Sequence, residues 1–145
     1  MFDFLKKKPK VSGMAGTGGQ HDSDDPPGLF QIEWQEFSSQ PGSGKRAVRA
    51  WADAQPIFER FLTEPPASDA FVILAVSPQT YLQVARNHAS DPPGSLILEH
   101  QVGSTDRHFT AAEPVTPALV ADIAEAYLLD PDSIGKMCAW AKLDI

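Results

Sequence analysis

Between Phe71 and Glu113 the chain is built from short apolar or alternating segments separated by turn residues. An apolar residue at every second position is typical of a strand with one buried face, and a short apolar run of a fully buried strand. The segments cover residues 71–77, 81–88, 95–103 and 107–113. Because short turns join them, the sequence predicts a four-stranded antiparallel meander over about 71–113.

The first turn decides which residues of this meander share a face. If Ser77 to Thr80 form the whole turn, Val76 pairs with Tyr81 and Ile73 pairs with Val84. This register predicts one buried face made of Phe71, Ile73, Ala75, Leu82 and Val84. The opposite face would carry Val72, Leu74, Val76, Tyr81 and Gln83, which is apolar enough to need covering by the protein or by a partner.

A second turn at 103–106 would place the last two strands side by side. In that register Phe109 shares a face with Leu96 and Leu98, and His108 lies opposite Gln101. His100 and His108 then point to opposite faces of the sheet.

Two further segments have the spacing of amphipathic helices, about 45–63 and 117–129. Pro56 lies inside the first, where it removes a backbone donor, so we expect a kink or break near Asp53 to Gln55. Thr116 followed by Pro117 is typical of a helix start. With possible extra strands at 30–37 and 139–145, the predicted fold class is α+β.

The composition indicates a single domain. Of 145 residues, 42% are apolar, and the formal net charge is −7, which argues against a nucleic-acid partner. The only cysteine, Cys138, cannot form an intrachain disulfide, and the chain has neither a secretory signal nor an apolar run long enough to span a membrane. We therefore expect a cytoplasmic domain at residues 29–145.

Residues 1–28 have the composition of a flexible N-terminal tail, rich in Lys, Gly, Ser and Asp. Phe2, Phe4 and Leu5 beside four lysines are also compatible with a weak contact to an anionic membrane or with a locally packed terminus.

The residue types used in catalysis are present without the spacing that catalysis requires. The segment 42–45, Gly-Ser-Gly-Lys, resembles the end of a phosphate-binding loop, but Ser39 and Arg46 break that pattern, and Ser43 is expected to cap the following helix. The histidines lack metal-ligand spacing, and Cys138 lies in an apolar setting where a thiol is unreactive. The sequence predicts no metal, no cofactor and no enzymatic activity.

Two surfaces remain as candidate binding sites. The first is a polar patch on the third and fourth strands, formed by Glu99, Gln101, His108 and Thr110. The second is an acidic outer surface of the helix at 117–129 and the turn after it, where residues 113–132 contain no Lys or Arg. Its acidic candidates are Asp122, Glu125, Asp130 and Asp132. Such a surface would attract a basic protein partner.

The last third of the chain, from LEHQVGSTDRHFTAAEPVT to AYLLDPDSIGKMCAWAKLDI, resembles small bacterial immunity proteins of toxin systems. The resemblance covers about 70–145 and implies a protein that binds and blocks a partner toxin. The overall character is also similar to acidic secretion chaperones, which dimerise and hold an unfolded client. A small enzyme with an unrecognised site is the third alternative.

Overall fold

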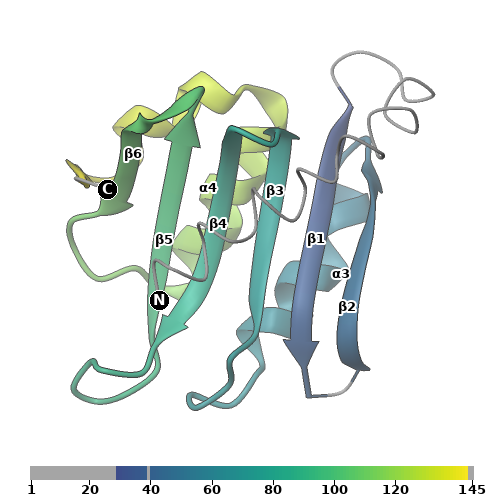
Figure 1. Ribbon diagram of the computed structural model, residues 1–145, viewed down its shortest axis with the longest axis vertical. Helices are drawn as coiled ribbons and strands as arrows, with labels where there is room; N and C mark the ends of the chain where they lie inside the picture. Colours follow the sequence, from purple (N-terminus) through teal and green to yellow (C-terminus); the bar gives the residue numbers. More distant parts are fainter. Residues whose placement is uncertain (1–28, 39, 144–145) are drawn as a thin grey trace.

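The computed structural model describes residues 29–38 and 40–143. The predicted tail at 1–28 lies outside these residues. The described chain forms one seven-stranded antiparallel sheet in the order β2-β1-β3-β4-β5-β6-β7, with both α-helices on the same face (Figure 1). The strands are β1 (Phe30–Phe37), β2 (Gln40–Val48), β3 (Phe71–Ser77), β4 (Thr80–Asn87), β5 (Ser95–Val102), β6 (Ser104–Ala111) and β7 (Trp140–Lys142). The helical segments are α3 (Trp51–Leu62), α4 (Pro117–Leu129) and the 3₁₀ helix η1 (Pro131–Lys136).

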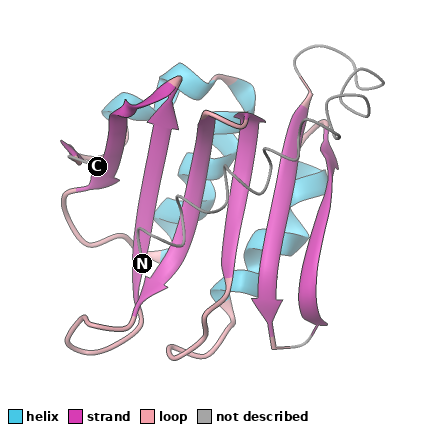
Figure 2. Cartoon of the chain, in the orientation of Figure 1, coloured by secondary structure: helices cyan, strands magenta, loops and turns pink. Residues whose placement is uncertain are grey.

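The main core lies between the sheet and the two helices. Alternate strand residues point toward the helices, and they pack with the apolar sides of α3 and α4. The strands contribute Ile32, Val72, Leu74, Leu82, Val84 and Leu98, and the helices contribute Ala54, Ile57, Phe58, Phe61, Val120, Ile123, Ala124 and Tyr127. Figure 2 shows this two-layer arrangement of helices and strands.

Local signals fix where the helices begin. The Asp53 carboxylate accepts hydrogen bonds from the backbone N–H groups of Arg49 (2.9 Å) and Ala50 (3.3 Å) at the start of α3. The Thr116 hydroxyl accepts a bond from the Leu119 N–H (3.1 Å) at the start of α4, and proline follows at the first helical position. The helix predicted at 117–129 is therefore confirmed.

The α+β class and the antiparallel sheet are confirmed, but the strand count of four is too low. The segment 30–37 is strand β1, and β7 lies within the segment 139–145. The helix predicted at 45–63 is partly wrong, because residues 45–48 end strand β2 and the helix begins only at Trp51. Ser43 also lies in β2, paired with Gln35, and does not cap a helix.

The break expected at Pro56 does not occur, since α3 continues from Trp51 to Leu62. A proline at this position costs the helix one hydrogen bond, to the carbonyl of Ala52. Burial of Ile57, Phe58 and Phe61 on the same helix outweighs that loss.

The predicted register of the first hairpin is wrong by one residue. Ala75 pairs with Tyr81, and Ile73 pairs with Gln83. The ladder is irregular between Ala75 and Ser77, so Val76 is an extra residue and is 42% exposed. As a result, Val72 and Leu74 join Leu82 and Val84 under the helices, whereas Phe71, Ile73 and Ala75 lie on the other face.

The second predicted turn, at 103–106, is too long, since β6 begins at Ser104. A shift in register between Gln101 and Val102 absorbs the difference. The pairing of Gln101 with His108 and the placing of Phe109 on the side of Leu98 are confirmed. Among the described residues, no helix is both long and apolar enough to cross a membrane.

Candidate functional site

The face of the sheet opposite α3 and α4, called here the open face, has no described helix or strand over it (Figure 1). Its central side chains are nevertheless buried. They are Phe71, Ile73, Tyr81, Gln83, Ala85, Glu99, Gln101 and His108, each 7% exposed or less. A bare sheet face would leave such side chains accessible to water, so this face has the character of an interior.

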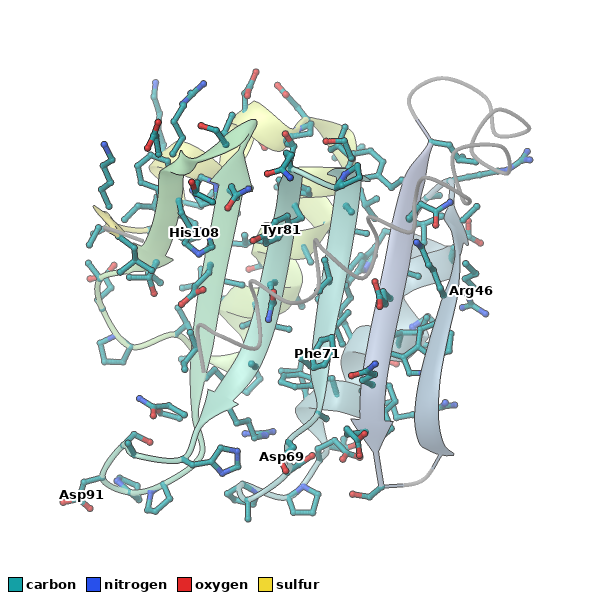
Figure 3. The ribbon with its side chains drawn as sticks, in the orientation of Figure 1. Arg46, Asp69, Phe71, Tyr81, Asp91 and His108 are labelled. Carbon is teal, nitrogen blue, oxygen red and sulfur yellow. The ribbon has the colours of Figure 1, made fainter. Side chains whose placement is uncertain are left out.

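The open face has an apolar part over β3 and β4. Phe71, Ile73, Tyr81 and Ala85 form a buried cluster of their own, and Ala75 packs against it. This cluster is separate from the main core because the residues alternate with the helix-facing ones along each strand. Figure 3 labels Phe71, Tyr81 and His108, which come from β3, β4 and β6.

Beside the apolar part, a buried hydrogen-bond network joins β4, β5 and β6. The two ring nitrogens of His108 are both used: Nδ1 lies 3.1 Å from Gln101 Oε1, and Nε2 lies 3.0 Å from Glu99 Oε1. The Tyr81 hydroxyl donates to Gln101 Oε1 at 3.4 Å. His108 and Glu99 are each 1% exposed, so this network is screened from water.

The orientation of the Gln101 amide fixes one proton in this network. Gln101 Nε2 donates to the Gln79 main-chain carbonyl at 3.1 Å, and a carbonyl can only accept. Gln101 Oε1 therefore faces His108 and is an acceptor, which makes His108 Nδ1 a donor. A single further proton is shared between His108 Nε2 and Glu99 Oε1.

Among the residues that the structure describes, three buried polar atoms of the open face have no hydrogen-bond partner. They are both amide atoms of Gln83, which is 3% exposed, and Oε2 of Glu99. Gln83 and Glu99 lie opposite each other on β4 and β5, so these atoms gather at one place. Leaving a buried polar group unpaired costs about 1–3 kcal/mol, which makes this place the strongest candidate for a ligand contact.

The hydrogen bonds of His108 and the protonation of Tyr81 hold these two side chains in fixed donor and acceptor roles. Burial raises the pKa of Tyr81 to about 12, and the charge of Glu99 acts in the same direction, so the phenol stays protonated and serves as a donor. A general base must present a free nitrogen or oxygen to its substrate. Both nitrogens of His108 are already bonded to side chains of the sheet.

The structure brings together the predicted polar patch. Glu99, Gln101 and His108 meet in the network described above, and half-buried Thr110 pairs with Glu99 at its margin. Glu99 is not the exposed, solubilising residue that its polar neighbours suggest, because it is 1% exposed.

The predicted acidic surface lies elsewhere. Asp122, Glu125, Asp130 and Asp132 are exposed on α4, its end and η1, which pack on the helix side of the sheet. Asp130 has a local role, because its carboxylate accepts a bond from the Asp132 N–H at 3.0 Å. The polar patch and the acidic helix therefore lie on opposite sides of the molecule and do not form one surface.

Two residues of the open face, Gln83 and Tyr81, were missed as site residues. The sequence signal was present, since both alternate with Leu82 and Val84, but the shifted register paired them with the wrong residues of β3. Within residues 29–38 and 40–143, no group of three or more His, Cys, Asp or Glu side chains is arranged to hold a metal ion.

Cys138 is half-buried against the main core. Burial raises the pKa of its thiol, and the charge of Glu113 raises it further. A thiol with a raised pKa forms less of the nucleophilic thiolate at neutral pH.

The fold is thus an α+β domain with a seven-stranded antiparallel sheet and helices on one face. Comparison with protein-family models, with curated proteins and with solved structures gave no match.

Proposed function

We propose that this chain is a non-enzymatic protein-binding domain and that the open face is its binding surface. The observation that carries the proposal is the group of buried, unpartnered atoms on Gln83 and Glu99. Burying an unpaired polar group costs about 1–3 kcal/mol of stability, and an apolar side chain at position 83 would avoid this cost for the two Gln83 atoms. A face that keeps them is suited to a partner that bonds to them.

The unpartnered atoms define the chemistry of that partner. Gln83 Nε2 needs an acceptor, whereas Gln83 Oε1 and Glu99 Oε2 need donors. A peptide segment supplies both kinds of group through its backbone N–H and C=O. The net charge of −7 favours a basic segment, because opposite charge steers encounter.

The resemblance of residues 70–145 to immunity proteins suggests the consequence of binding. We propose a cytoplasmic inhibitor that holds a basic partner protein and blocks its activity. The acidic surface of α4, on the other side of the sheet, would then act at long range on the encounter rate and not in the contact itself.

One observation favours an enzyme as the second candidate, the contact between Glu99 and His108 at 3.0 Å. A carboxylate that orients a histidine is a common part of a catalytic site. Here the other ring nitrogen is held by Gln101, so proton transfer by His108 would require this network to open first.

The experiment compares two matched charge variants of the full chain. Ile97→Lys with Thr110→Lys changes half-buried positions of the open face, and Asp122→Asn with Glu125→Gln changes the exposed side of α4. Each pair raises the net charge by two. A partner is captured from the native cell and identified, and its affinity for each purified variant is measured by titration calorimetry.

We expect the open-face pair to weaken binding at least tenfold, and the α4 pair to slow association mainly at low salt. Loss of affinity with the α4 pair alone would overturn the assignment of the surface. An inhibitor abolishes the partner's activity at one-to-one stoichiometry, whereas a chaperone forms a stable dimer and holds an extended client. Turnover of a small metabolite without any protein partner would favour the enzyme.

A further inference from the structure

One side of the sheet ends in strand β2, called here the β2 edge. Among the described strands, β1 alone pairs with β2, and none lies beyond it (Figure 1). Alternate backbone N–H and C=O groups of an edge strand point away from the sheet, so they can pair with an added strand. β2 has nine residues, whereas β7 at the opposite side of the sheet has three. The β2 edge therefore offers the longer backbone for such pairing.

Positive charge gathers along the β2 edge, although the chain as a whole is acidic. Lys45, Arg46 and Arg49 lie within five residues, and residues 37–52 contain no Asp or Glu. All three side chains are exposed. Glu33 lies opposite Lys45 on β1, and no described carboxylate forms an ion pair with any of the three cations. The edge is thus a local basic site on a protein of net charge −7.

An aromatic ring lies over the same edge. Trp34 on β1 pairs with Gly44 on β2, and a Cβ atom added at Gly44 would collide with Cζ2, Cε2 and Cη2 of the indole. The ring therefore covers the backbone of the edge strand at this glycine. Arg46 is next to it: its guanidinium carbon lies 5.9 Å from the centre of the indole ring, and its Nη2 donates to the Asp53 main-chain carbonyl at 2.8 Å. Trp34 is half-buried, so part of the ring is accessible to solvent. Figure 3 labels Arg46 beside β2.

We propose that the β2 edge binds an extended acidic segment of another protein, which adds to the sheet as a further strand. An added strand would lie about 4.8 Å beyond β2. Its side chain beside Gly44 would contact the Trp34 indole and should be apolar, whereas its side chains beside Lys45 and Arg46 should be Asp or Glu. In this mode of recognition the backbone supplies affinity and the side-chain positions supply selectivity.

A second copy of the chain suits this edge less well than an acidic strand. If two β2 strands paired in a symmetric dimer, both sets of Lys45, Arg46 and Arg49 would meet at the same interface. Like charges across a strand pair are destabilising, and charge on an edge strand is a common protection against self-association. The same charges attract an acidic strand, so they select the partner.

The test uses the full chain and three capped peptides of about ten residues, long enough to span a strand. The first has a central Leu among Glu and Thr residues, and the second has Lys in place of Glu. The third carries the Glu sequence on an N-methylated backbone, which cannot donate hydrogen bonds. We expect the Glu peptide to shift the ¹⁵N amide signals of residues 44–48 and to slow exchange of the outward amides about tenfold. The other two peptides should bind about tenfold more weakly, or less tightly still.

Two matched variants test where the Glu peptide binds. Lys45→Glu with Arg49→Glu reverses charge at the β2 edge, and Arg107→Glu with Lys136→Glu reverses the same charge at exposed positions of β6 and η1. The amide spectrum shows whether each variant is folded. We expect the β2 pair to weaken binding of the Glu peptide about tenfold and the control pair to have a much smaller effect.

Equal affinity for the Glu and Lys peptides, or for the N-methylated peptide, would overturn the proposal, and so would no binding up to the solubility limit. Shifts of the β2 amides that depend on protein concentration without peptide would show that the occupant is a second copy. The partner proposed for the open face is basic, so each proposal can fail without the other. Binding of the Glu peptide at β2 without any partner for the open face removes only the proposed function.

Discussion

Gln83 and Glu99 face each other across β4 and β5, and neither bonds to the other. The Glu99 carboxyl group bonds to His108 through Oε1 and leaves Oε2 unused, while both amide atoms of Gln83 are unused. A sheet stabilised by its own side chains would pair these groups. Their juxtaposition leaves donors and acceptors for a third group.

Replacing Gln83 with Leu should leave the protein as stable as wild type or more stable. The change removes two buried polar atoms that have no partner, so we expect the free energy of unfolding to rise by about 1 kcal/mol. Urea unfolding followed by Trp fluorescence measures it.

Gln101→Leu is the matched control, because Gln101 bonds to His108, Tyr81 and Gln79. Losing those bonds should lower the free energy of unfolding by about 2–4 kcal/mol, since several buried partners are left unpaired. If Gln83→Leu is as destabilising as Gln101→Leu, the Gln83 amide is bonded in solution and the binding argument fails.

His100 should make stability depend on pH below neutrality. Its ring lies against Phe109 and Trp140, with centroids 5.0 and 4.5 Å away. Burial and, to a smaller extent, the neighbouring His108 together lower its pKa to about 4. The unfolded chain takes up a proton on His100 near pH 6.5 and the folded chain only near pH 4. The neutral ring's contribution to the free energy of unfolding is therefore complete above pH 6.5 and is lost as the pH drops toward 4.

The slope due to one proton is at most about 1.4 kcal/mol per pH unit. Denaturant unfolding at several pH values should show that His100→Phe loses this part of the slope, whereas His88→Gln, a change at an exposed site, keeps it. Identical slopes for wild type and His100→Phe would show that His100 is not buried as a neutral ring.

Gly44 should resist any larger residue. It lies opposite Trp34 in the β1–β2 pair, and a Cβ atom added there would collide with the indole ring. We expect Gly44→Ala to lower the free energy of unfolding by about 1–3 kcal/mol. Gly135→Ala is the control, because a Cβ there meets no atom within 4 Å, and its thermal midpoint should stay close to that of wild type.

Pro56 and Pro117 should respond in opposite directions to replacement with Ala. Pro56 lies inside α3, where it lacks a helix bond, so its replacement should stabilise the protein by about 1–3 kcal/mol. Pro117 is at the first position of α4, where the ring suits the helix, and its replacement should destabilise by up to about 1 kcal/mol. Thermal unfolding of both variants distinguishes the two. A loss of stability in Pro56→Ala would contradict the reasoning.

The parts of the fold predicted from sequence are those with a clear local signal. Thr116 and Pro117 start α4, and the alternation around Leu98 gives the right faces for β5 and β6. The sequence does not predict strand β2. Ala47 and Val48 end this strand and Trp51 begins a helix, but the spacing of these apolar residues is the same as that along one face of a single helix. Spacing alone does not show where one element stops and the next starts.

The candidate site was predicted in part for a related reason. Glu99, Gln101 and His108 were placed on one face because they depend on a single hairpin. The face on which Gln83 lies depends on the register of two hairpins. The extra residue Val76 shifts the pairing of β3 with β4 by one residue, so Gln83 pairs with Ile73. The burial of these polar residues could not be predicted, because alternation along a strand does not show how far each face is buried.

The position of β1 between β2 and β3 has a consequence for how the molecule assembles. Apart from β7, which returns to β6 after α4 and η1, the sheet consists of two locally built pieces, the β1–β2 hairpin and the β3–β6 meander. They join only where β1 meets β3, across the chain that forms α3. This seam joins the paired strands furthest apart in sequence, with Gln35 and Phe71 as its closest pair, so we expect the β1–β3 pairing to form late in folding.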